Sequence, residues 1–415
     1  MDKVKLGDIC DLKSSKRIFE SEYVESGIPF VRGLEISDGT LKSKRNNYEC
    51  YISCERYEEL KDSVGVPKIG DVLITAVGTI GNLYLVEDDY EFYFKDGNVI
   101  WLSNLDKSVI PEYLFYFLQS PYFKKQLEYA LIGAVQKALT IVMLKEIEVI
   151  LPEIGEQRRI ASLLSNLDNK IGNNQKLIKE LEDTARLIYD YWFTQFDFPD
   201  ENGKPYRSSG GKMVWNDELK REIPEGWDVK RLGEIASLLK STVQPKADVV
   251  YEHYSIPAFD DGKYPVFEPG SLIDSGKYLI TENSLLYSRL NPKFKRLWVP
   301  LCLSENLICS TEFLVFEPAN AAVRSFVYGV LDSSTYYAYM VSKAISSTGS
   351  RSRVDPQVAI DFVVPIPDEC LLMRFGNVLS PMLKQIKDLQ IQIEELVSLR
   401  GWLLPMLMNG QVKVS

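Results

Sequence analysis

The chain has 415 residues, of which 45% are hydrophobic and 26% are charged. This length predicts roughly two or three domains, and this composition excludes a disordered or collagen-like chain. Taken alone, the net charge of −10 argues against a protein that binds nucleic acid, because phosphate contacts require lysine and arginine. No apolar run reaches the roughly 18–20 residues that span a bilayer, and the N-terminus shows no secretory signal. We therefore expect a cytoplasmic protein without membrane contact.

The six cysteines are scattered, without the density of a disulfide framework. Cys50 and Cys54 together with His253, the single histidine of the chain, do not make a zinc site. One histidine also leaves little scope for acid–base catalysis by imidazole. We expect neither a metal site nor a catalytic site on this chain.

Residues 1–150 are expected to form a mixed, mainly β domain. Strands are predicted at residues 71–75 and 83–86, on either side of a glycine turn at residues 78–82. A helix is predicted over residues 111–129, where apolar residues recur on one face.

A long helix is expected over residues 151–194. Apolar residues recur there in alternating steps of four and three, which is the pattern of a coiled-coil seam, and an asparagine occupies one seam position. The seam residues are Ile160, Leu164, Leu167, Ile171, Asn174, Ile178, Leu181, Ala185 and Ile188. We expect Asn174 to be buried and to fix the register of the helix with its partner, at some cost in stability.

Residues 195–227 are expected to form an irregular linker, because proline and glycine recur in them. A second mixed domain is expected over residues 228–364. It opens with Lys-Arg-Leu-Gly-Glu-Ile at residues 230–235, which resembles Val-Lys-Leu-Gly-Asp-Ile at residues 4–9. Repeats of this length indicate a domain duplication, not a solenoid.

The second domain has the same predicted order of elements as the first. Strands are expected at residues 284–288 and 297–299, around a turn at residues 291–292. A helix is expected near residues 322–343, followed by a loop at residues 346–350.

Residues 365–415 are expected to form the second long helix and a C-terminal tail. Its seam residues are Phe375, Leu379, Met382, Ile386, Leu389, Ile393, Leu396 and Leu403. Pro381 interrupts this run, and a proline inside a helix costs about 3 kcal/mol. Ser380 and Pro381 instead suit the N-cap and first position of a new helix. We therefore predict a short helix first, then a main helix that starts at Pro381, ends near Leu404 and is closed by Pro405.

One seam alone would favour ordinary helix packing or homodimer formation. Two matching seams in one chain favour pairing with each other in antiparallel orientation, as a spacer. The sequence therefore predicts an α+β fold, in which two mixed, strand-rich domains are separated by two long antiparallel coiled-coil helices. Antiparallel pairing would relate the two domains by a pseudo-twofold axis.

Four segments are locally basic and contain no acidic residue, although the whole chain is acidic. They are residues 13–17, 42–45, 289–296 and 343–353. Any one of them could be a solubilising loop. Two in each repeat favour surfaces that meet a negatively charged partner such as the DNA backbone.

Several of these segments closely resemble one protein family. The linker sequence Phe-Asp-Phe-Pro-Asp-Glu-Asn-Gly-Lys-Pro-Tyr at residues 196–206, and Ile-Pro-Glu-Gly-Trp at residues 223–227, resemble the specificity subunits of type I restriction-modification systems. The Leu-Pro pair with a nearby Glu-Gln pair at residues 151–157, and the Gly-Thr-x-Gly-Asn turn at residues 78–82, are also similar to that family. The resemblance covers essentially the whole chain.

This resemblance implies that residues 1–150 and 228–364 are target recognition domains, each reading one half of a split, asymmetric DNA sequence. It implies three kinds of partner: double-stranded DNA, two methyltransferase (modification) subunits docked on the helices, and restriction and translocation subunits recruited by them. The seam residues of both helices are then the expected spacer and docking elements. Catalysis, with S-adenosylmethionine and with ATP and magnesium, is expected on the partner subunits, and no cofactor is expected on this chain.

The second domain departs from the family pattern, because Arg-Leu-Asn-Pro-Lys-Phe at residues 289–294 takes the place of the glycine turn. Its Asn-Pro-Lys-Phe resembles the Asn-Pro-Pro-Tyr/Phe loop of amino methyltransferases, but lysine replaces the second proline. No glycine-rich cofactor turn accompanies it. We interpret the segment as a recognition loop, because cations cluster around it.

The candidate DNA contacts come from the basic segments and the two turns, with Arg32 in addition, since arginine suits guanine and asparagine suits adenine. They are Lys16, Arg17, Arg32, Lys44, Arg45, Thr79, Asn82, Arg289, Asn291, Lys293, Lys295, Arg296, Arg351 and Arg353. Two other readings remain open. One is a coiled-coil assembly scaffold with protein-binding domains and no direct DNA readout, which the acidic balance favours; the other is a self-sufficient methyltransferase.

Overall fold

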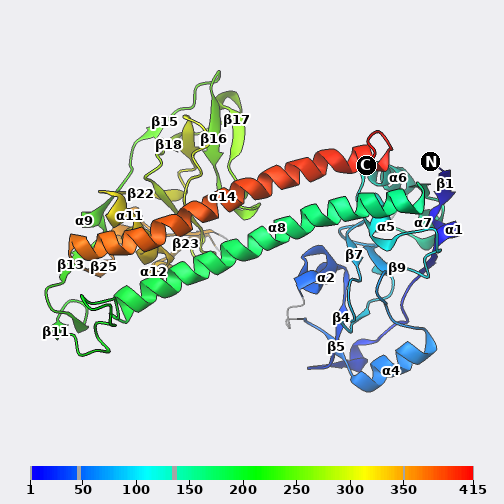
Figure 1. Cartoon of the computed structure of the whole chain (residues 1–415), viewed down its shortest axis with the longest axis horizontal. Coiled ribbons are helices and arrows are strands. Elements are labelled where there is room, and N and C mark those ends of the chain that lie inside the picture. The colour runs from blue at the N-terminus through cyan, green and yellow to red at the C-terminus, as the bar shows by residue number, and fades with distance from the viewer. Residues whose placement is uncertain (1, 44–47, 133–137, 349–350, 415) are drawn as a thin grey trace. The chain divides into compact units, whose positions relative to one another are not determined.

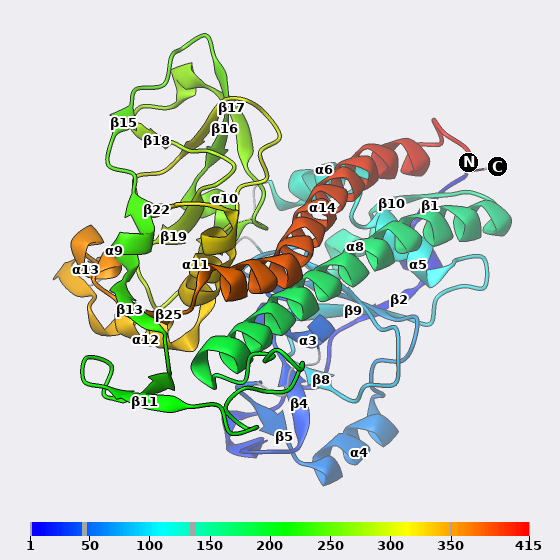
Figure 2. The same cartoon turned by 60° about the vertical axis from the view of Figure 1, so that its left-hand side comes forward.

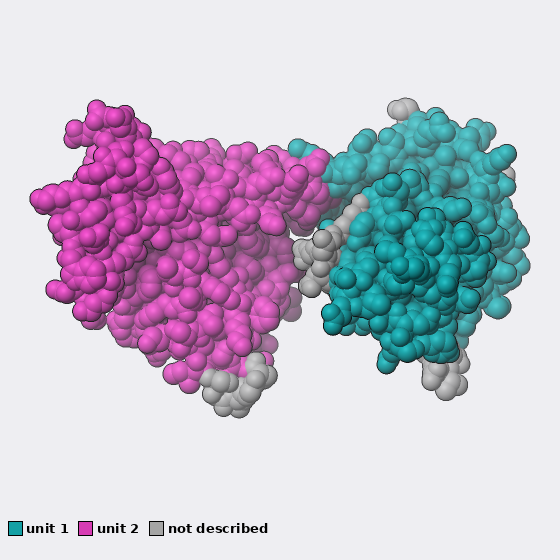
Figure 3. Space-filling view, turned by 90° about the horizontal axis from the view of Figure 1, so that it is seen from below, with its two compact units in different colours: residues 1–170, 396–415 teal, residues 171–395 magenta. Residues whose placement is uncertain are grey.

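The computed structural model describes residues 2–43, 48–132, 138–348 and 351–414. It divides into two compact units, one formed by residues 1–170 with 396–415 and the other by residues 171–395 (Figure 3). Both units contain strands and helices. The two long helices are α8 (Ile154–Tyr189) and α14 (Glu369–Met408), seen in Figure 1. The predicted α+β class with two long helices is confirmed.

The first unit is built on an antiparallel sheet with the strand order β2-β9-β6-β7. Its central strands, β6 (Val72–Thr75) and β9 (Val99–Ser103), are buried along their whole length, as expected of short unbroken apolar runs. The flanking strands are β2 (Asp11–Lys13) and β7 (Leu83–Leu85). Val72 lies opposite both Leu85 and Leu102.

The same unit holds a second sheet with the order β3-β5-β4-β8, in which β4 and β8 run parallel. Its strands are β3 (Tyr23–Val24), β5 (Tyr51–Ile52), β4 (Ile28–Val31) and β8 (Tyr93–Phe94). The shorter helices of the unit are α1 (Leu6–Ile9), α2 (Gly33–Ser37), α3 (Thr40–Ser43), α4 (Cys54–Ser63), α5 (Pro111–Phe117), α6 (Pro121–Leu131) and α7 (Ile141–Lys145).

The helix predicted over residues 111–129 is two helices, α5 and α6. Ser120 starts the second one, because its side-chain oxygen accepts a hydrogen bond from the backbone N of Phe123 at 3.3 Å. Pro121 takes the first helical position, where its missing N–H costs no hydrogen bond.

A short strand pair closes the first domain. β1 (Asp2–Lys5) pairs antiparallel with β10 (Glu148–Leu151), directly before α8. Gln157 of α8 is completely buried. Its amide donates to the carbonyls of Ser108 and Pro152, both at 2.8 Å, and its Oε1 accepts from the backbone N of Ile110 at 2.9 Å. The start of the long helix is thus tied to the domain by a fully satisfied buried amide.

The second unit repeats this plan. Its antiparallel sheet has the order β14-β22-β19-β20, and β13 pairs with β25 as β1 pairs with β10. These strands are β14 (Ala236–Leu238), β22 (Phe313–Pro318), β19 (Leu285–Ser288), β20 (Leu297–Trp298), β13 (Asp228–Arg231) and β25 (Val363–Ile366). By position in the sheet, β19 and β20 correspond to β6 and β7, so the loops that join each pair are equivalent.

The second unit also has a five-stranded sheet with the order β15-β18-β21-β16-β17. Its strands are β15 (Thr242–Val243), β18 (Lys277–Leu279), β21 (Leu307–Cys309), β16 (Val250–Tyr254) and β17 (Val266–Pro269). The shorter helices are α9 (Leu232–Ile235), α10 (Ile256–Asp260), α11 (Ala321–Asp332), α12 (Ser334–Ser342) and α13 (Pro356–Ile360).

Two local predictions for this unit are wrong. The single helix expected near residues 322–343 is split into α11 and α12, because the Ser333 hydroxyl caps the second helix by accepting from Tyr336 N at 3.2 Å. The loop expected at residues 346–350 is in part a strand. β23 (Ile345–Thr348) pairs with β24 (Arg351–Arg353), and residues 349–350 lie outside the described residues.

The predicted break at Pro381 is also wrong, because α14 is one helix of 40 residues that continues through Pro381. Phe375, Leu379 and Leu383 lie on both sides of the proline and are buried in one core. Burial of this continuous stripe offsets the lost hydrogen bond. Ser380 does not cap a new helix; its hydroxyl lies 3.2 Å from that of Ser325.

Pro405 does not close α14 either. The helix runs one further turn to Met408, because Leu407 and Met408 are completely buried in the core of the first unit. The backbone N of Asn409 still donates to the carbonyl of Pro405 at 3.0 Å.

Within the second unit, α8 and α14 run antiparallel. Near one end, Asn174 of α8 contacts Gln392 of α14; near the other, Phe193 packs on Phe375 at 4.8 Å between ring centroids. Phe326 of α11 joins the same aromatic cluster, so α11 lies against α14 (Figure 2). A π-helical turn at Asp190–Thr194 ends α8.

The linker is more regular than expected. β11 (Met213–Asn216) and β12 (Arg221–Pro224) form a hairpin in it. Phe198 stacks between Tyr206 and Trp227, at 4.6 and 5.3 Å between ring centroids. Throughout the part of the chain that the structure describes, no helix is long and apolar enough to cross a membrane.

Candidate nucleic-acid interface

The loop between β6 and β7 is a tight turn organised by Thr75. Its side-chain oxygen donates to the carbonyl of Thr79 at 2.5 Å and accepts from the backbone N of Asn82 at 2.9 Å. Gly78 and Gly81 have positive φ angles of 71° and 91°, which suit residues without a Cβ. Thr79 is exposed and Asn82 is half-buried. Thr75 was missed by the sequence analysis, because a threonine at a strand end carries no turn signal.

The equivalent loop of the second unit, residues 289–296, is here called the recognition loop. The backbone N of Ser288 donates to the carbonyl of Arg296 at 2.9 Å and closes its base. Inside it, Phe294 N donates to the carbonyl of Asn291 at 2.9 Å, and Asn291 has a φ of 48°. The loop therefore has a defined backbone conformation.

β24 lies along the recognition loop. The backbone N of Asn291 donates to the Ser352 carbonyl at 2.8 Å, and the Asn291 side-chain oxygen accepts from Ser352 N at 2.9 Å. Val354 N donates to the Arg289 carbonyl at 3.1 Å. The structure thus joins two of the predicted basic segments into one surface. It also commits the Asn291 oxygen to the backbone, which leaves that atom unavailable to hold a base as in a methyltransferase loop.

Glu312 connects two of the predicted arginines. It accepts from Arg353 Nε at 3.0 Å and from Nη2 at 2.5 Å, and Arg289 Nε lies 3.7 Å away. The hydrogen bond from Arg353 holds the pKa of Glu312 below its usual value. Arg289 Nε is buried and has no hydrogen bond among the described residues. Glu312 was also missed, because it precedes a buried strand and is far from both arginines in sequence.

Two other predicted cations are held in ion pairs inside the second unit. Lys295 donates to Asp332, which also accepts from Arg186 Nε of α8 at 3.0 Å. Burial lowers the pKa of Lys295 despite this partner. Arg296 forms two parallel hydrogen bonds with Asp260, at 2.7 and 2.9 Å. Both side chains support the recognition loop from below its surface.

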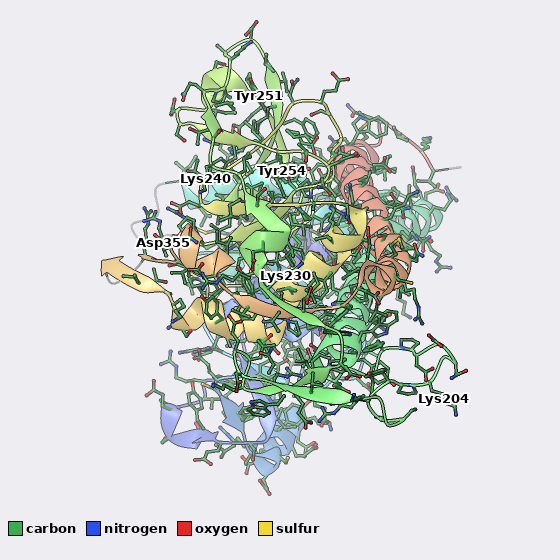
Figure 4. All side chains as sticks on the ribbon, turned by 90° about the vertical axis from the view of Figure 1, so that its left-hand side faces the viewer. Lys204, Lys230, Lys240, Tyr251, Tyr254 and Asp355 are labelled. Carbon is green, nitrogen blue, oxygen red and sulfur yellow. The ribbon has the colours of Figure 1, made fainter. Side chains whose placement is uncertain are left out.

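The exposed groups of this surface are Lys293, Phe294 and Arg351. Beside it lies a cavity of about 330 Å³ between β14, β22 and α13, lined by Arg289, Lys240 and Asp355 among others. Lys240 and Asp355 are labelled in Figure 4. Charged groups of both signs therefore border the recognition loop.

In the first unit the predicted cations are more scattered. Lys16 is exposed, and its backbone N donates to the Tyr93 hydroxyl at 2.8 Å. Arg17 pairs with Asp96 at 2.9 Å but keeps 69% of its side chain exposed. Arg32 pairs with Glu35 at 2.6 Å and Glu49 at 2.9 Å. Lys44 and Arg45 lie outside the described residues.

The predicted seam residues of α8 and α14 fall into two groups by burial. Those buried are Ile160, Leu164, Asn174, Ala185, Phe375, Leu379, Ile386 and Leu389. Those half-buried are Leu167, Ile171, Ile178, Leu181, Ile188, Met382, Ile393, Leu396 and Leu403. Asn174 is 2% exposed, and its amide N donates to Gln392 Oε1 at 3.3 Å.

Arg400, which breaks the second seam pattern, has a defined partner in the first unit. Its Nε lies 2.7 Å from the Asp168 carboxylate of α8, and its Nη2 donates to Gln119 at 2.5 Å. Asp168 also accepts from the Tyr116 hydroxyl at 2.8 Å. A polar network thus replaces the apolar seam at this level.

Comparison with known proteins finds similarity to specificity subunits of type I restriction enzymes. Residues 1–183 match the family model described as type I restriction modification DNA specificity domain. The chain is 25% identical over 424 residues to the type I restriction enzyme MjaIX specificity subunit of Methanocaldococcus jannaschii, covering 95% of this chain and 88% of that protein. It is 31% identical over 194 residues to a putative type I restriction enzyme specificity subunit of Haemophilus influenzae, covering 46% of this chain and 47% of that protein.

Among solved structures, the fold is similar to that of the S subunit of a type I restriction-modification system from M. genitalium. The TM-score is 0.59 at 17% sequence identity, over 98% of this chain and 95% of the other. At this identity the likeness concerns the fold.

Proposed function

We propose that this chain, which is similar over 95% of its length to a type I restriction enzyme specificity subunit, is the DNA-reading component of a type I restriction-modification complex and performs no catalysis itself. Each strand-rich domain reads one half of a split, asymmetric target. The observation that carries this proposal is the pair of equivalent loops on equivalent strands. One is the compact turn after β6, and the other is the basic loop after β19. A shared scaffold with different loops suits two different half-sites.

The distribution of charge supports DNA as the partner. Lys16 and Arg17 of the first unit, and Lys293 and Arg351 of the second, are exposed on a chain with a net charge of −10. Exposed cations of this kind neutralise phosphates and make binding depend steeply on salt concentration. Arg289 and Arg353, held by Glu312, are better placed for directional contacts with bases.

The long helices suit a spacer. At 1.5 Å per residue, the 36 residues of α8 extend over roughly 54 Å and the 40 residues of α14 over roughly 60 Å. We propose that they set the distance between half-sites that lie about one helical turn, roughly 34 Å, apart on DNA. Removal of seven residues from both helices should then shorten the tolerated gap by a few base pairs. An unchanged gap would refute the ruler role.

The partners follow from the same proposal. Two methyltransferase subunits dock on the helices, and restriction and translocation subunits join them. S-adenosylmethionine, ATP and magnesium are then needed by those partners, and this chain carries no cofactor. The complex acts on cellular DNA, which places the protein in the cytoplasm.

One observation favours a second candidate, an assembly scaffold without DNA readout. Arg296, Lys295 and Arg353 are all held by acidic side chains of the same unit. An electrophoretic titration of target and non-target duplexes with the assembled complex separates the two candidates. A scaffold would add no sequence preference to the methyltransferase subunits.

The decisive experiment is to map methylated positions in the genome of cells with and without the gene. A split motif that disappears with the gene supports the proposal. Exchange of residues 228–362 for those of another family member should then change only one half of the motif. A motif that survives the exchange unchanged would refute half-site reading.

A further inference from the structure

Phe294 is a large apolar side chain at the exposed surface of the recognition loop. It is 64% exposed, although most phenylalanines of the second unit are buried. A single exposed apolar residue is common on protein surfaces and needs no explanation by itself. This one is unusual because of where it lies and how firmly its backbone is fixed.

The backbone around Phe294 is fixed from several sides. Phe294 N donates to the Asn291 carbonyl at 2.9 Å, and the Tyr337 hydroxyl of α12 donates to the Lys293 carbonyl at 3.1 Å. The next residues, Lys295 and Arg296, are anchored by Asp332 and Asp260. Phe294 is therefore held outward by a rigid loop, and its exposure does not come from a loose backbone.

The equivalent loop of the first unit behaves differently. Its apolar residue, Ile80, is half-buried and packs against the core of that unit. The equivalent loops thus turn an apolar side chain inward in one domain and outward in the other. The difference lies in a region that the proposed function assigns to DNA reading.

One face of the Phe294 ring is partly covered. The guanidinium of Arg296 lies over the ring, 5.5 Å from its centroid, and Arg296 is only 12% exposed because Asp260 holds it. An apolar wedge is inserted between base steps and unstacks them, and a guanidinium beside one ring face leaves less of the ring for such stacking. A ring with one partly covered face suits a one-sided contact at a base edge.

We propose that Phe294 contacts the 5-methyl group of a thymine in the major groove of the second half-site. Thymine is the base that presents an apolar group in that groove. The flanking exposed cations, Lys293 and Arg351, are free to meet the phosphates on either side. This inference rests on the proposed function and adds to it a residue that determines specificity for a particular base.

The test uses the full chain assembled with its methyltransferase subunits and a duplex that carries the mapped target. Uracil replaces thymine at one position at a time, which removes only the methyl group. Affinity is measured at fixed salt concentration for the wild type, Phe294→Ala and Phe294→Leu. Trp215→Ala is the matched control, because Trp215 is also exposed (61%) in the second unit but lies on β11 of the linker.

At one position of the second half-site, uracil should weaken binding by the wild type and by Trp215→Ala about fourfold. This is the loss of affinity expected when one buried methyl group is removed. Phe294→Ala should bind both duplexes alike, and Phe294→Leu should keep part of the discrimination. Uracil in the first half-site should affect every variant equally. Unfolding curves of Phe294→Ala should match the wild type, since an exposed side chain is removed.

Three results would overturn the inference. The first is an equal effect of uracil on the wild type and on Phe294→Ala at every position, and the second is a second half-site without thymine on either strand. The third is unstacking of 2-aminopurine in the second half-site by the wild type but not by Phe294→Ala. The last result would indicate a wedge. If exchange of residues 228–362 still changes half of the methylated motif, the proposed function stands and only the role of Phe294 fails. If no motif depends on the chain, both fail.

Discussion

Glu312 and Arg353 form two parallel hydrogen bonds, at 2.5 and 3.0 Å, that join the start of β22 to β24. Because Arg289 lies 3.7 Å from the same carboxylate, one acidic side chain positions two arginines of the second domain. Glu312→Gln should therefore reduce methylation at the second half-site and leave the first half-site unchanged. Exposed Glu305 supplies the control, and Glu305→Gln should leave both half-sites unchanged.

The same pair predicts a pH dependence. The pKa of Glu312 is lowered in the folded protein, chiefly by the hydrogen bond from Arg353. Its contribution to stability is present above the pKa of an unfolded glutamate, about 4.3, and is lost as the pH falls through the lower folded value. Urea midpoints of the wild type and Glu312→Gln should differ at pH 7 and converge below pH 4. A difference that persists in acid would contradict the pairing.

Lys293 and Lys295 are two residues apart and should behave differently. Lys293 is exposed, so Lys293→Ala should weaken binding to all DNA sequences and reduce the slope of log affinity against log salt by about 1. Lys295 is tied to Asp332 below the loop, so Lys295→Ala should lower the thermal midpoint of unfolding. Fluorescence anisotropy over a salt series and a thermal melt measure the two effects. Equal salt slopes for Lys293→Ala and the wild type would remove Lys293 from the interface.

Pro381→Ala should stabilise the protein by about 1–2 kcal/mol, because α14 is continuous through this position and alanine restores a helical hydrogen bond. Pro121 is the matched control, since it stands at the first position of α6, where Pro121→Ala should not stabilise. Urea denaturation of the full chain gives both values. A loss of stability in Pro381→Ala would show that the proline starts a separate helix.

Asn174→Leu should raise the free energy of unfolding by roughly 1 kcal/mol, because a buried polar seam residue is replaced by an apolar one. The substitution also removes the contact with Gln392 that favours one register. The methylated motif should then tolerate more than one gap length. Greater stability with a single unchanged gap would exclude a register role for Asn174.

Arg400 and Asp168 should show a coupling of about 1 kcal/mol in a double-mutant cycle of Arg400→Ala and Asp168→Asn, since both side chains are less than one-third exposed. Additive effects would show that the ion pair contributes nothing to stability. Lys176→Ala and Glu180→Gln form a control cycle, because that pair is exposed on α8 at 3.8 Å.

Repeated local patterns made much of the fold predictable. Three patterns depend only on residues that are close in sequence, so they are visible without the structure. They are the Leu-Gly-Asp/Glu-Ile openings of the two domains, the unbroken apolar strands, and the steps of four and three between seam residues of the long helices. Pro381 was misjudged because local helix rules ignore the buried stripe formed by Phe375 and Leu383. Ser120 and Ser333 divide helices whose apolar spacing runs on across the break, so periodicity alone did not reveal them.

The candidate interface was less predictable than the fold. Clusters of cations are visible in a sequence, but their partners are not. Asp260 and Asp332 lie 36 and 37 residues from the cations that they hold, and Glu312 lies 41 residues from Arg353. Only the folded structure distinguishes Lys293, whose side chain is exposed, from Arg296, whose side chain is largely covered.

The first unit is formed by two segments that are far apart in the sequence, which has a consequence for biosynthesis. Residues 1–170 share their unit with residues 396–415, and Leu404, Leu407 and Met408 complete a core that begins at Leu6. On the ribosome, residues 1–170 are thus made before residues 396–415 can complete their core. A nascent chain must carry this unfinished apolar surface until residues 396–415 have been made. A frameshift that alters residues 396–415 would damage a domain encoded far upstream of it.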